Sequence, residues 1–306
     1  MLVWSVFSQV LLPILVMVGI GWLIDRAGRL DLSTLVRLNI YVIVPAFIFV
    51  HVVDSNLSGG AAARIMGFTA SIIASMYVLS AVIGRWKKYD PAQTRALQLA
   101  TMFYNSGNYG IPLMALAYPG IGPLLQVFIV LTQNISTFTV GLALAASTHR
   151  SGWRLALPML RQISIYAVIS AVIVRIFHLP VQQIRWLWVP LHYISDALVA
   201  FALITLGVQL SQTKARQNPA RLGWALGLRL LVAPCVALAM VPLFGFRGQE
   251  ATIMVVSSSF PTAVNTALIA HEFKADAQFA AAVVFYSTLL SMFTVTLLIA
   301  VLGGGS

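Results

Sequence analysis

The stretch YNSGNYGIP at residues 104–112 decides the fold, because it interrupts an otherwise apolar segment of roughly 92–118. Glycine lowers helix propensity, and proline removes a backbone donor and clashes with the preceding turn. A second stretch, SSSFPTAVN at residues 257–265, interrupts the apolar segment of roughly 249–271 in the same way. We therefore predict two helices that are each broken near the middle.

The composition places both segments in a membrane. Of the 306 residues, 59% are hydrophobic and only 9% are charged, whereas about a quarter of an ordinary soluble domain is charged. The mean hydropathy is +0.90. The single cysteine, Cys235, excludes a disulfide within the chain. These values exclude a soluble enzyme, a disordered tail and a disulfide-stabilised scaffold, so most of the chain must face lipid.

Ten stretches are long and apolar enough to cross a bilayer, which takes about 20 residues. The connections between them are too short for a folded domain outside the membrane, and β-barrel alternation is absent. The expected fold is an all-α polytopic membrane protein with ten transmembrane helices, at roughly 4–24, 35–53, 65–84, 92–118, 122–146, 157–177, 187–210, 222–245, 249–271 and 278–301.

Positive charge orients these spans. Fourteen of the 19 Lys and Arg residues fall in or beside the loops after odd-numbered spans, four fall on the other side, and Arg229 lies inside span 8. Basic residues concentrate on the cytoplasmic side of membrane proteins. We therefore expect both termini to face outward. The membrane also accounts for the net charge of +11, and no motif for binding nucleic acid is present.

The ten spans divide into two sets of five, residues 1–146 and 157–301. Five is odd, so the two sets have opposite topology, which is typical of inverted-repeat transporters. The two interruptions occupy the fourth span of each set. Interrupted segments at corresponding positions are a strong sequence pointer to a transport site.

Unwound backbone cannot face lipid and must line a cavity, where helix N-termini favour anions and helix C-termini favour cations. Asparagine side chains can donate and accept hydrogen bonds to a ligand; the alternative is a kink used only for packing. The predicted substrate-binding residues in the two breaks are Asn105, Gly107, Asn108, Tyr109, Gly110, Pro112, Ser259, Pro261, Thr262 and Asn265.

Four further polar residues lie inside other spans. Gln133 and Asn134 could contact substrate or pack between helices. Arg229 could offset the charge of an anion, or its side chain could reach the interface. Asp196 is a candidate for coupling transport to protons, or a satisfied polar group. The scattered histidines show no metal-ligand spacing, so we predict no metal and no cofactor, with H+ or Na+ as the possible coupling ion.

Seven stretches of the chain together carry a resemblance to a known family. They are Leu12-Pro13, GIGWL (19–23), Arg29-Leu30-Asp31, LNIYVIVPA (38–46), NSGNYGIP (105–112), LGVQL (206–210) and FPTAVN (260–265). In these stretches the chain resembles the auxin efflux carrier family, which includes plant PIN proteins and bacterial carriers of small carboxylates. The resemblance covers essentially the whole chain and implies an elevator movement of spans 3–5 and 8–10 against a scaffold of spans 1, 2, 6 and 7, often dimeric. The short loop at 147–156 favours a bacterial type.

The expected function is secondary transport of small organic anions, such as malate, malonate or auxin-like acids, in the bacterial inner membrane. A sodium-coupled bile-acid-type symporter or a cation/proton antiporter is an alternative, but an antiporter would carry acidic residues beside the break, and none lies between Asp90 and Asp196. A third hypothesis is an intramembrane hydrolase, because residues 105–107 resemble part of a rhomboid serine site. That motif needs glycine where Tyr104 stands.

Overall fold

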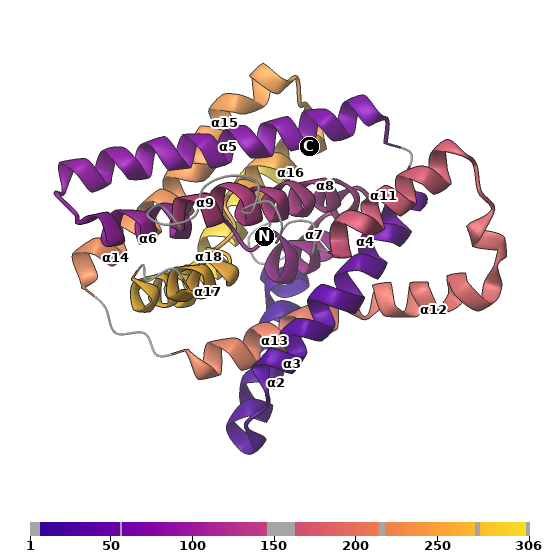
Figure 1. Cartoon of the computed structure of the whole chain (residues 1–306), viewed down its shortest axis with the longest axis horizontal. Helices are drawn as coiled ribbons and strands as arrows, with labels where there is room; N and C mark the ends of the chain where they lie inside the picture. Colours follow the sequence, from indigo (N-terminus) through magenta and orange to yellow (C-terminus); the bar gives the residue numbers. More distant parts are fainter. Residues whose placement is uncertain (1–6, 56, 146–162, 214–217, 273–275, 304–306) are drawn as a thin grey trace.

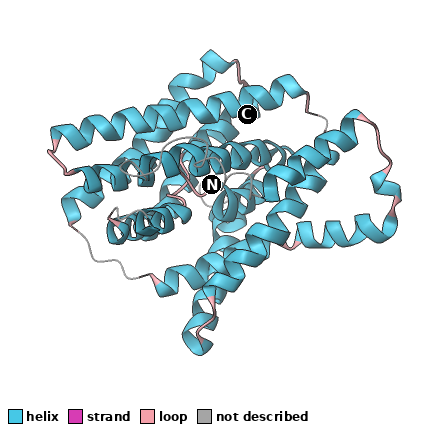
Figure 2. Ribbon diagram, viewed as in Figure 1, coloured by secondary structure: helices cyan, strands magenta, loops and turns pink. Residues whose placement is uncertain are grey.

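The structure is a computed structural model that describes residues 7–55, 57–145, 163–213, 218–272 and 276–303. Every regular element in these ranges is a helix (Figure 2). The predicted junction between the two five-span sets, around residues 147–156, lies outside the described residues. The chain is an all-helical, multi-pass membrane protein, as its composition predicts.

The helices of the first half follow the predicted spans, with π-helical turns at several joins. Their bounds are η1 (Phe7–Leu11), α2 (Leu12–Gly28), α3 (Leu32–Leu38), η2 (Asn39–Ile43), α4 (Val44–Val53), α5 (Gly59–Trp86), α6 (Pro91–Met102), η3 (Ser106–Gly110), α7 (Ile111–Ala117), α8 (Ile121–Ser136), η4 (Thr137–Gly141) and α9 (Leu142–Ala145).

The second half repeats this pattern of long and interrupted helices (Figure 1). Its elements are α11 (Ile163–Ile176), η6 (Val181–Gln183), α12 (Arg185–Asp196), α13 (Leu198–Gln212), α14 (Pro219–Gly227), η7 (Leu228–Val232), α15 (Ala233–Met240), η8 (Val241–Phe244), α16 (Gly248–Ser258), α17 (Asn265–Glu272) and α18 (Ala277–Gly303).

Within the described residues, seven continuous helices are long and apolar enough to span a membrane. The number is below ten because segments 92–118 and 249–271 are interrupted, and because α11 begins beside residues outside the described ranges. Large apolar side chains on the outer surface, such as Leu243 (80% exposed) and Phe293 (71%), fit a lipid-facing exterior. The inverted-repeat arrangement of ten spans remains a prediction.

Four π-helical turns share one sequence feature. Each of η1, η2, η3 and η7 ends two residues before a proline, at Pro13, Pro45, Pro112 and Pro234 respectively. Proline cannot donate to the carbonyl one turn earlier, and its ring clashes with that carbonyl. A wider π-helical turn accommodates the ring without ending the helix. The prolines therefore explain where these spans widen.

Several helix pairs pack closely along their length. Helix α2 lies against α13, α4 lies against α11, and α5 packs against both α6 and α8, while α18 contacts α6, α14 and α16. The α2–α13 contact is a close backbone approach. A Cβ atom at Gly21 would lie 2.1 Å from the Ile204 carbonyl oxygen, and one at Gly207 would lie 2.0 Å from the Val18 carbonyl oxygen. These two glycines allow the helices to meet.

A carboxylate cap starts α3 between the first two spans. Asp31 accepts hydrogen bonds from the Thr34 hydroxyl (2.5 Å) and from the backbone N–H of Ser33 (3.0 Å). These donors favour the charged form, and they hold the pKa of Asp31 below its ordinary value of 3.8. The cap thus stabilises the fold above that pH, and its contribution is lost as the pH falls through the lowered pKa.

We expect Asp31→Ala to lower the thermal unfolding temperature at pH 7. The difference in unfolding temperature between wild type and variant should become smaller below about pH 4. Unfolding of both proteins in detergent, followed from neutral to acidic pH, measures this. A temperature difference that persisted unchanged at the lowest pH would show that the carboxylate is not the group responsible.

Candidate functional site

The two predicted breaks lie side by side and pair with each other. Helix α6 ends at Met102 and is followed by the extended residue Phe103, whereas α16 ends at Ser258 and is followed by a turn at Ser259. Tyr104 and Thr262 form an antiparallel bridge. The Asn105 N–H donates to the Pro261 carbonyl oxygen (2.7 Å), and the Ala263 N–H donates to the Phe103 carbonyl oxygen (3.0 Å). The pairing satisfies backbone groups that could not be left bare in a membrane interior.

Buried polar side chains support this crossing. Gln126 of α8 donates to the Ser106 carbonyl oxygen (2.8 Å) and accepts from the Ser257 hydroxyl (3.0 Å), so it bridges the two breaks. Thr262 donates through its hydroxyl to the Ala100 carbonyl oxygen (2.6 Å). Gln126 and Thr262 are both fully buried. The crossing is therefore held by its own backbone and by a neighbouring helix.

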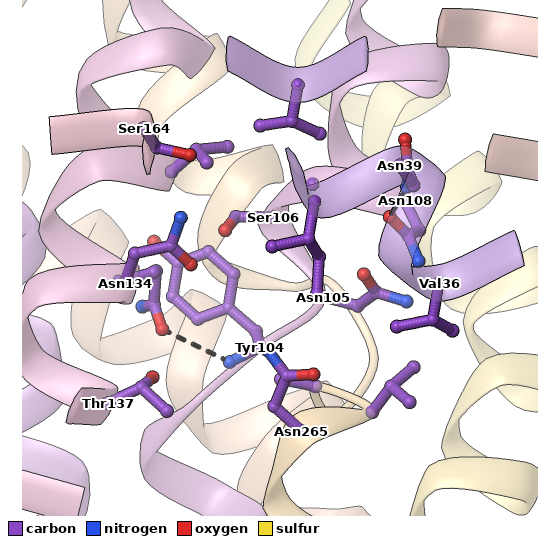
Figure 3. A pocket seen from close by; sticks show the side chains of 17 residues that line it. Val36, Asn39, Tyr104, Asn105, Ser106, Asn108, Asn134, Thr137, Ser164 and Asn265 are labelled. Carbon is purple, nitrogen blue, oxygen red and sulfur yellow. Dashed lines mark hydrogen bonds between the residues drawn. The ribbon is translucent and has the colours of Figure 1, made fainter. Parts of the chain in front are cut away.

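A cavity of about 90 Å³ lies beside the crossing (Figure 3). Its walls come from both breaks, from α8 and η4, from the α3–α4 span and from α11. None of the residues that line it is charged. The lining residues are Val36, Asn39, Ile40, Val44, Tyr104, Asn105, Ser106, Gly107, Asn108, Val130, Gln133, Asn134, Thr137, Ser164, Ala263, Val264 and Asn265.

Two helix N-termini face this cavity. The helix formed by η3 and α7 starts at Ser106, and α17 starts at Asn265. Residues 105–108 and 263–265, which lie at these two starts, line the cavity. Helix N-termini carry free N–H groups and partial positive charge. The side-chain nitrogens of Asn105 and Gln133 are buried and have no hydrogen-bond partner. The cavity therefore offers donors without a fixed charge, which suits an anion.

The α3–α4 span reaches the crossing through one asparagine. The Asn39 side-chain nitrogen donates to the Asn108 side-chain oxygen (2.6 Å), which joins η2 to η3 at the edge of the cavity (Figure 3). Sequence reasoning did not select Asn39. A signal was available: it lies six residues before Pro45, the spacing that also separates Ser106 from Pro112. Tyr104, Ser106, Thr137 and Ser164 are further lining residues that were not selected.

The predicted substrate residues fall into two sets. Six of them line the cavity: Asn105, Gly107, Asn108, Gln133, Asn134 and Asn265. The others lie outside the lining and build the crossing. Tyr109 packs edge-on against Phe260, with ring centroids 5.5 Å apart. The outside set is Tyr109, Gly110, Pro112, Ser259, Pro261, Thr262 and Arg229.

Close packing at the crossing explains why residue 110 is a glycine. A Cβ atom there would lie 2.6 Å from the Phe260 ring and 2.7 Å from the Gln126 side-chain nitrogen. By contrast, a Cβ atom at Gly107 would meet nothing within 4 Å. Gly110 therefore serves the contact between the two breaks, while Gly107 lies at the open side of the cavity.

Arg229 does not reach the membrane interface, and it does not line the cavity. It is fully buried in η7, and its guanidinium donates to the carbonyl oxygens of Thr101 (2.8 Å) and Ser258. Its guanidinium carbon lies 4.9 Å from the centre of the Tyr104 ring. Of the two alternatives for Arg229, contact with the anion is not supported by the cavity lining, and a side chain that extends to the interface is not what the structure shows, because both terminal nitrogens bond inward.

Asp196 is also separate from the cavity at the crossing. It is the last residue of α12, it is exposed, and it lines a second cavity of about 310 Å³. His51, Asp54 and His192 line that cavity too, and His192 Nε2 lies 3.7 Å from Asp54 Oδ2. The coupling candidate thus sits among other titratable groups, between α4, α12 and the start of α8.

Known proteins resemble this chain along its whole length. The family described as membrane transport protein matches residues 6–156 and 155–299. An uncharacterized transporter of Methanothermobacter thermautotrophicus is 27% identical over 95% of this chain and 96% of its own length. A Rhizobium meliloti protein named "Putative malonate transporter" is 24% identical over 98% and 97%. An uncharacterized transporter of Methanocaldococcus jannaschii is 24% identical over 94% and 96%.

Proposed function

Because the chain belongs to the membrane transport protein family, which is the auxin efflux carrier family, we propose that it is a secondary carrier of small organic anions. It is a multi-pass membrane transporter and not an enzyme. One observation carries the proposal: two helix N-termini and two unpartnered amide nitrogens face one cavity that has no charged lining residue.

We assign the substrate to the small carboxylates. A carboxylate accepts hydrogen bonds only, so it matches the unpartnered side-chain nitrogens of Asn105 and Gln133. It also brings the negative charge that helix N-termini stabilise. The name of the Rhizobium meliloti relative makes malonate the first compound to test, followed by malate and auxin-like acids.

The transport mechanism we propose is alternating access by an elevator movement. In this proposal α2, α4, α11 and α13 form the scaffold group, and the cavity lies between α4 and α11 of that group and the two breaks. The Asn39–Asn108 hydrogen bond joins these groups and would have to break when one slides past the other. Dimerisation through the first group, a bacterial inner-membrane location and outward-facing termini belong to the same proposal.

Cation coupling receives less support from the cavity. Its lining contains no Asp or Glu residue, and carboxylates and other oxygens are the ligands that hard cations prefer. No group of three or more His, Cys, Asp and Glu residues suited to a metal occurs in the part of the chain that the structure describes.

Ligand-dependent stability tests the substrate class. We expect malonate or another small carboxylate to raise the unfolding temperature of the purified protein, because a ligand at about 100 times its Kd stabilises the folded state by about 2.7 kcal/mol. Chloride at equal ionic strength is the control, and uptake into liposomes confirms transport. If dicarboxylates, auxin-like acids and bile acids all failed to shift the unfolding temperature, the proposal would be wrong.

For coupling, we expect Asp196→Asn to flatten the pH dependence of uptake, because an amide cannot bind and release a proton as a carboxyl group can. Uptake rates of wild type and variant between pH 5 and 8 measure the effect. Asp54→Asn in the same cavity is the matched control for a change of local charge. A pH profile that stayed unchanged in Asp196→Asn would remove this residue from the coupling proposal.

A further inference from the structure

The C-terminal ends of α6 and α16 converge on one buried cation. Thr101 is the penultimate residue of α6, and Ser258 is the last residue of α16. Their carbonyl oxygens both accept hydrogen bonds from the Arg229 guanidinium. The last carbonyls of a helix have no partner within it and carry partial negative charge. Arg229 therefore satisfies two helix ends that belong to the two broken segments.

No carboxylate forms an ion pair with Arg229 in the described part of the chain. Arg229 is 0% exposed, its two terminal nitrogens donate to the two carbonyl oxygens, and its Nε has no hydrogen-bond partner among the described residues. The face of Tyr104 lies against the guanidinium and adds a cation–π contact. The positive charge is thus balanced by helix ends and an aromatic ring, without an acidic side chain.

Converging helix C-termini are also a natural site for a metal cation. In transporters with broken helices, half-helix C-termini and unwound carbonyls coordinate a coupling Na+. Here a planar guanidinium, with donors fixed in a fork, bonds two carbonyls at once. A metal ion in this position would have to displace a side chain that cannot leave the buried site without exposing those carbonyls.

We propose that Arg229 is a built-in counter-cation that replaces a coupling metal ion. It joins α6 to α16 at their negative ends, and so it positions the opposite, positive starts of η3 and α17 around the anion. It acts through the backbone and does not touch the substrate. The carrier consequently binds and moves its anion without Na+. The proposal rests on the proposed function only for the identity of the transported anion.

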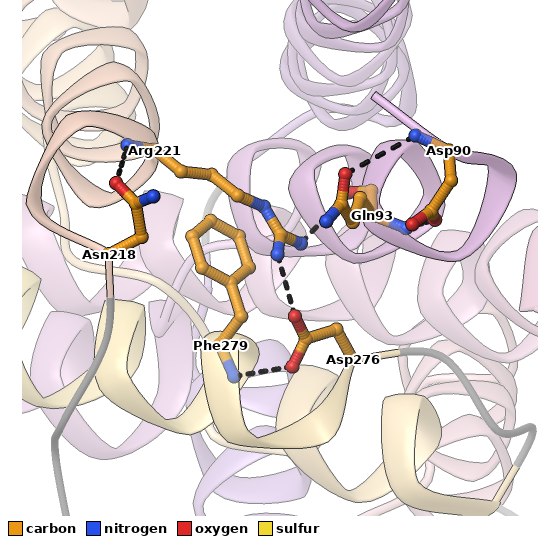
Figure 4. Close-up of polar contacts among 6 residues, drawn as sticks. All are labelled: Asp90, Gln93, Asn218, Arg221, Asp276 and Phe279. Carbon is orange, nitrogen blue, oxygen red and sulfur yellow. Dashed lines mark hydrogen bonds and ion pairs between the residues drawn. The ribbon is translucent and has the colours of Figure 1, made fainter. Parts of the chain in front are cut away.

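The experiment compares cation dependence in three full-length proteins. Arg229→Gln removes the charge, Arg229→Lys keeps it with a poorer fit, and Arg221→Gln is the control. Arg221 is buried in α14 and pairs with Asp276 (2.6 Å) and the Gln93 carbonyl oxygen (3.2 Å), away from the crossing (Figure 4). Unfolding temperature is measured without substrate, in NaCl, LiCl, KCl or choline chloride at equal ionic strength.

For Arg229→Gln, we expect NaCl or LiCl at about 100 mM to raise the unfolding temperature by about 3 °C relative to choline chloride, because a cation fills the exposed carbonyl site. Wild type and Arg221→Gln should show no such difference. The unfolding temperature of Arg229→Lys, like that of wild type, should not depend on Na+. A generally weakened fold would not respond selectively to small cations.

Uptake gives a second measurement that does not depend on the variants folding well. Wild-type uptake of malonate should differ by less than about twofold between Na+ and choline media, since no coupling cation is required. A wild-type requirement for Na+ would overturn the proposal. So would an Arg229→Gln protein that binds no cation. Absence of any anion-dependent shift in wild type would instead contradict the proposed function, which the cation measurements do not test.

Discussion

Replacing Asn108 or Asn265 with alanine should reduce uptake of the transported carboxylate by about 10- to 100-fold each, since a hydrogen bond to a charged group contributes about 1.5–3 kcal/mol. Asn265 begins α17, and Asn108 lies in the first turn of η3. Both line the cavity from the two broken segments. The loss should appear mainly as weaker substrate binding, measured by initial uptake rates in liposomes over a range of substrate concentrations.

Asn218→Ala is the matched control for this experiment. Asn218 also stands at a helix start, where it caps α14 through the N–H groups of Ala220 and Arg221, but it does not line the crossing cavity. Its removal should cost about 1 kcal/mol of stability and leave substrate affinity unchanged. If Asn108→Ala and Asn265→Ala inserted normally and transported at the wild-type rate, the cavity would not be the substrate site.

The second large effect concerns the α2–α13 contact. We expect Gly207→Ala to destabilise the protein by about 3 kcal/mol or more, because a methyl group 2.0 Å from the Val18 carbonyl oxygen forces two backbones apart. A flexible side chain could turn away, but a backbone carbonyl inside a helix cannot. The unfolding temperature in detergent and the fraction of protein that elutes as a single species measure this loss.

Gly19→Ala provides the matched control on the partner helix. A Cβ atom there meets nothing within 4 Å, although Gly19 lies only two residues from Gly21 in α2. Alanine in a helix interior is more favourable than glycine by about 1 kcal/mol, so Gly19→Ala should be neutral or stabilising. Equal unfolding temperatures for Gly207→Ala and Gly19→Ala would contradict the close approach of α2 and α13.

Sequence reasoning located the helices well. The second predicted span, 35–53, corresponds to Leu32–Val53, and the last, 278–301, to Ala277–Leu302. Long apolar runs are sufficient for this, because the bilayer requires every spanning segment to satisfy its own backbone. The two breaks were predictable for the same reason, since glycine, proline and asparagine cluster in them and in few other places of the spans.

What a buried side chain faces was less predictable. Arg229 lies in a helix that is apolar around most of its circumference, so periodicity does not show which way it points. Its partners, Thr101 and Ser258, are backbone carbonyls about 130 and 30 residues distant in sequence. Gln126 and Asn39 were missed because isolated amides in spans usually pack between helices. The structure shows that both connect to the breaks.

The Tyr104–Thr262 bridge has a mechanical consequence. Pulling the two broken segments apart would strip partners from the Asn105 and Ala263 N–H groups and from two carbonyls in a region of low polarity, at several kcal/mol for each group left bare. A displacement of either segment is therefore transmitted to the other. The crossing therefore behaves as one rigid unit, and in the proposed elevator mechanism the two broken segments would move together.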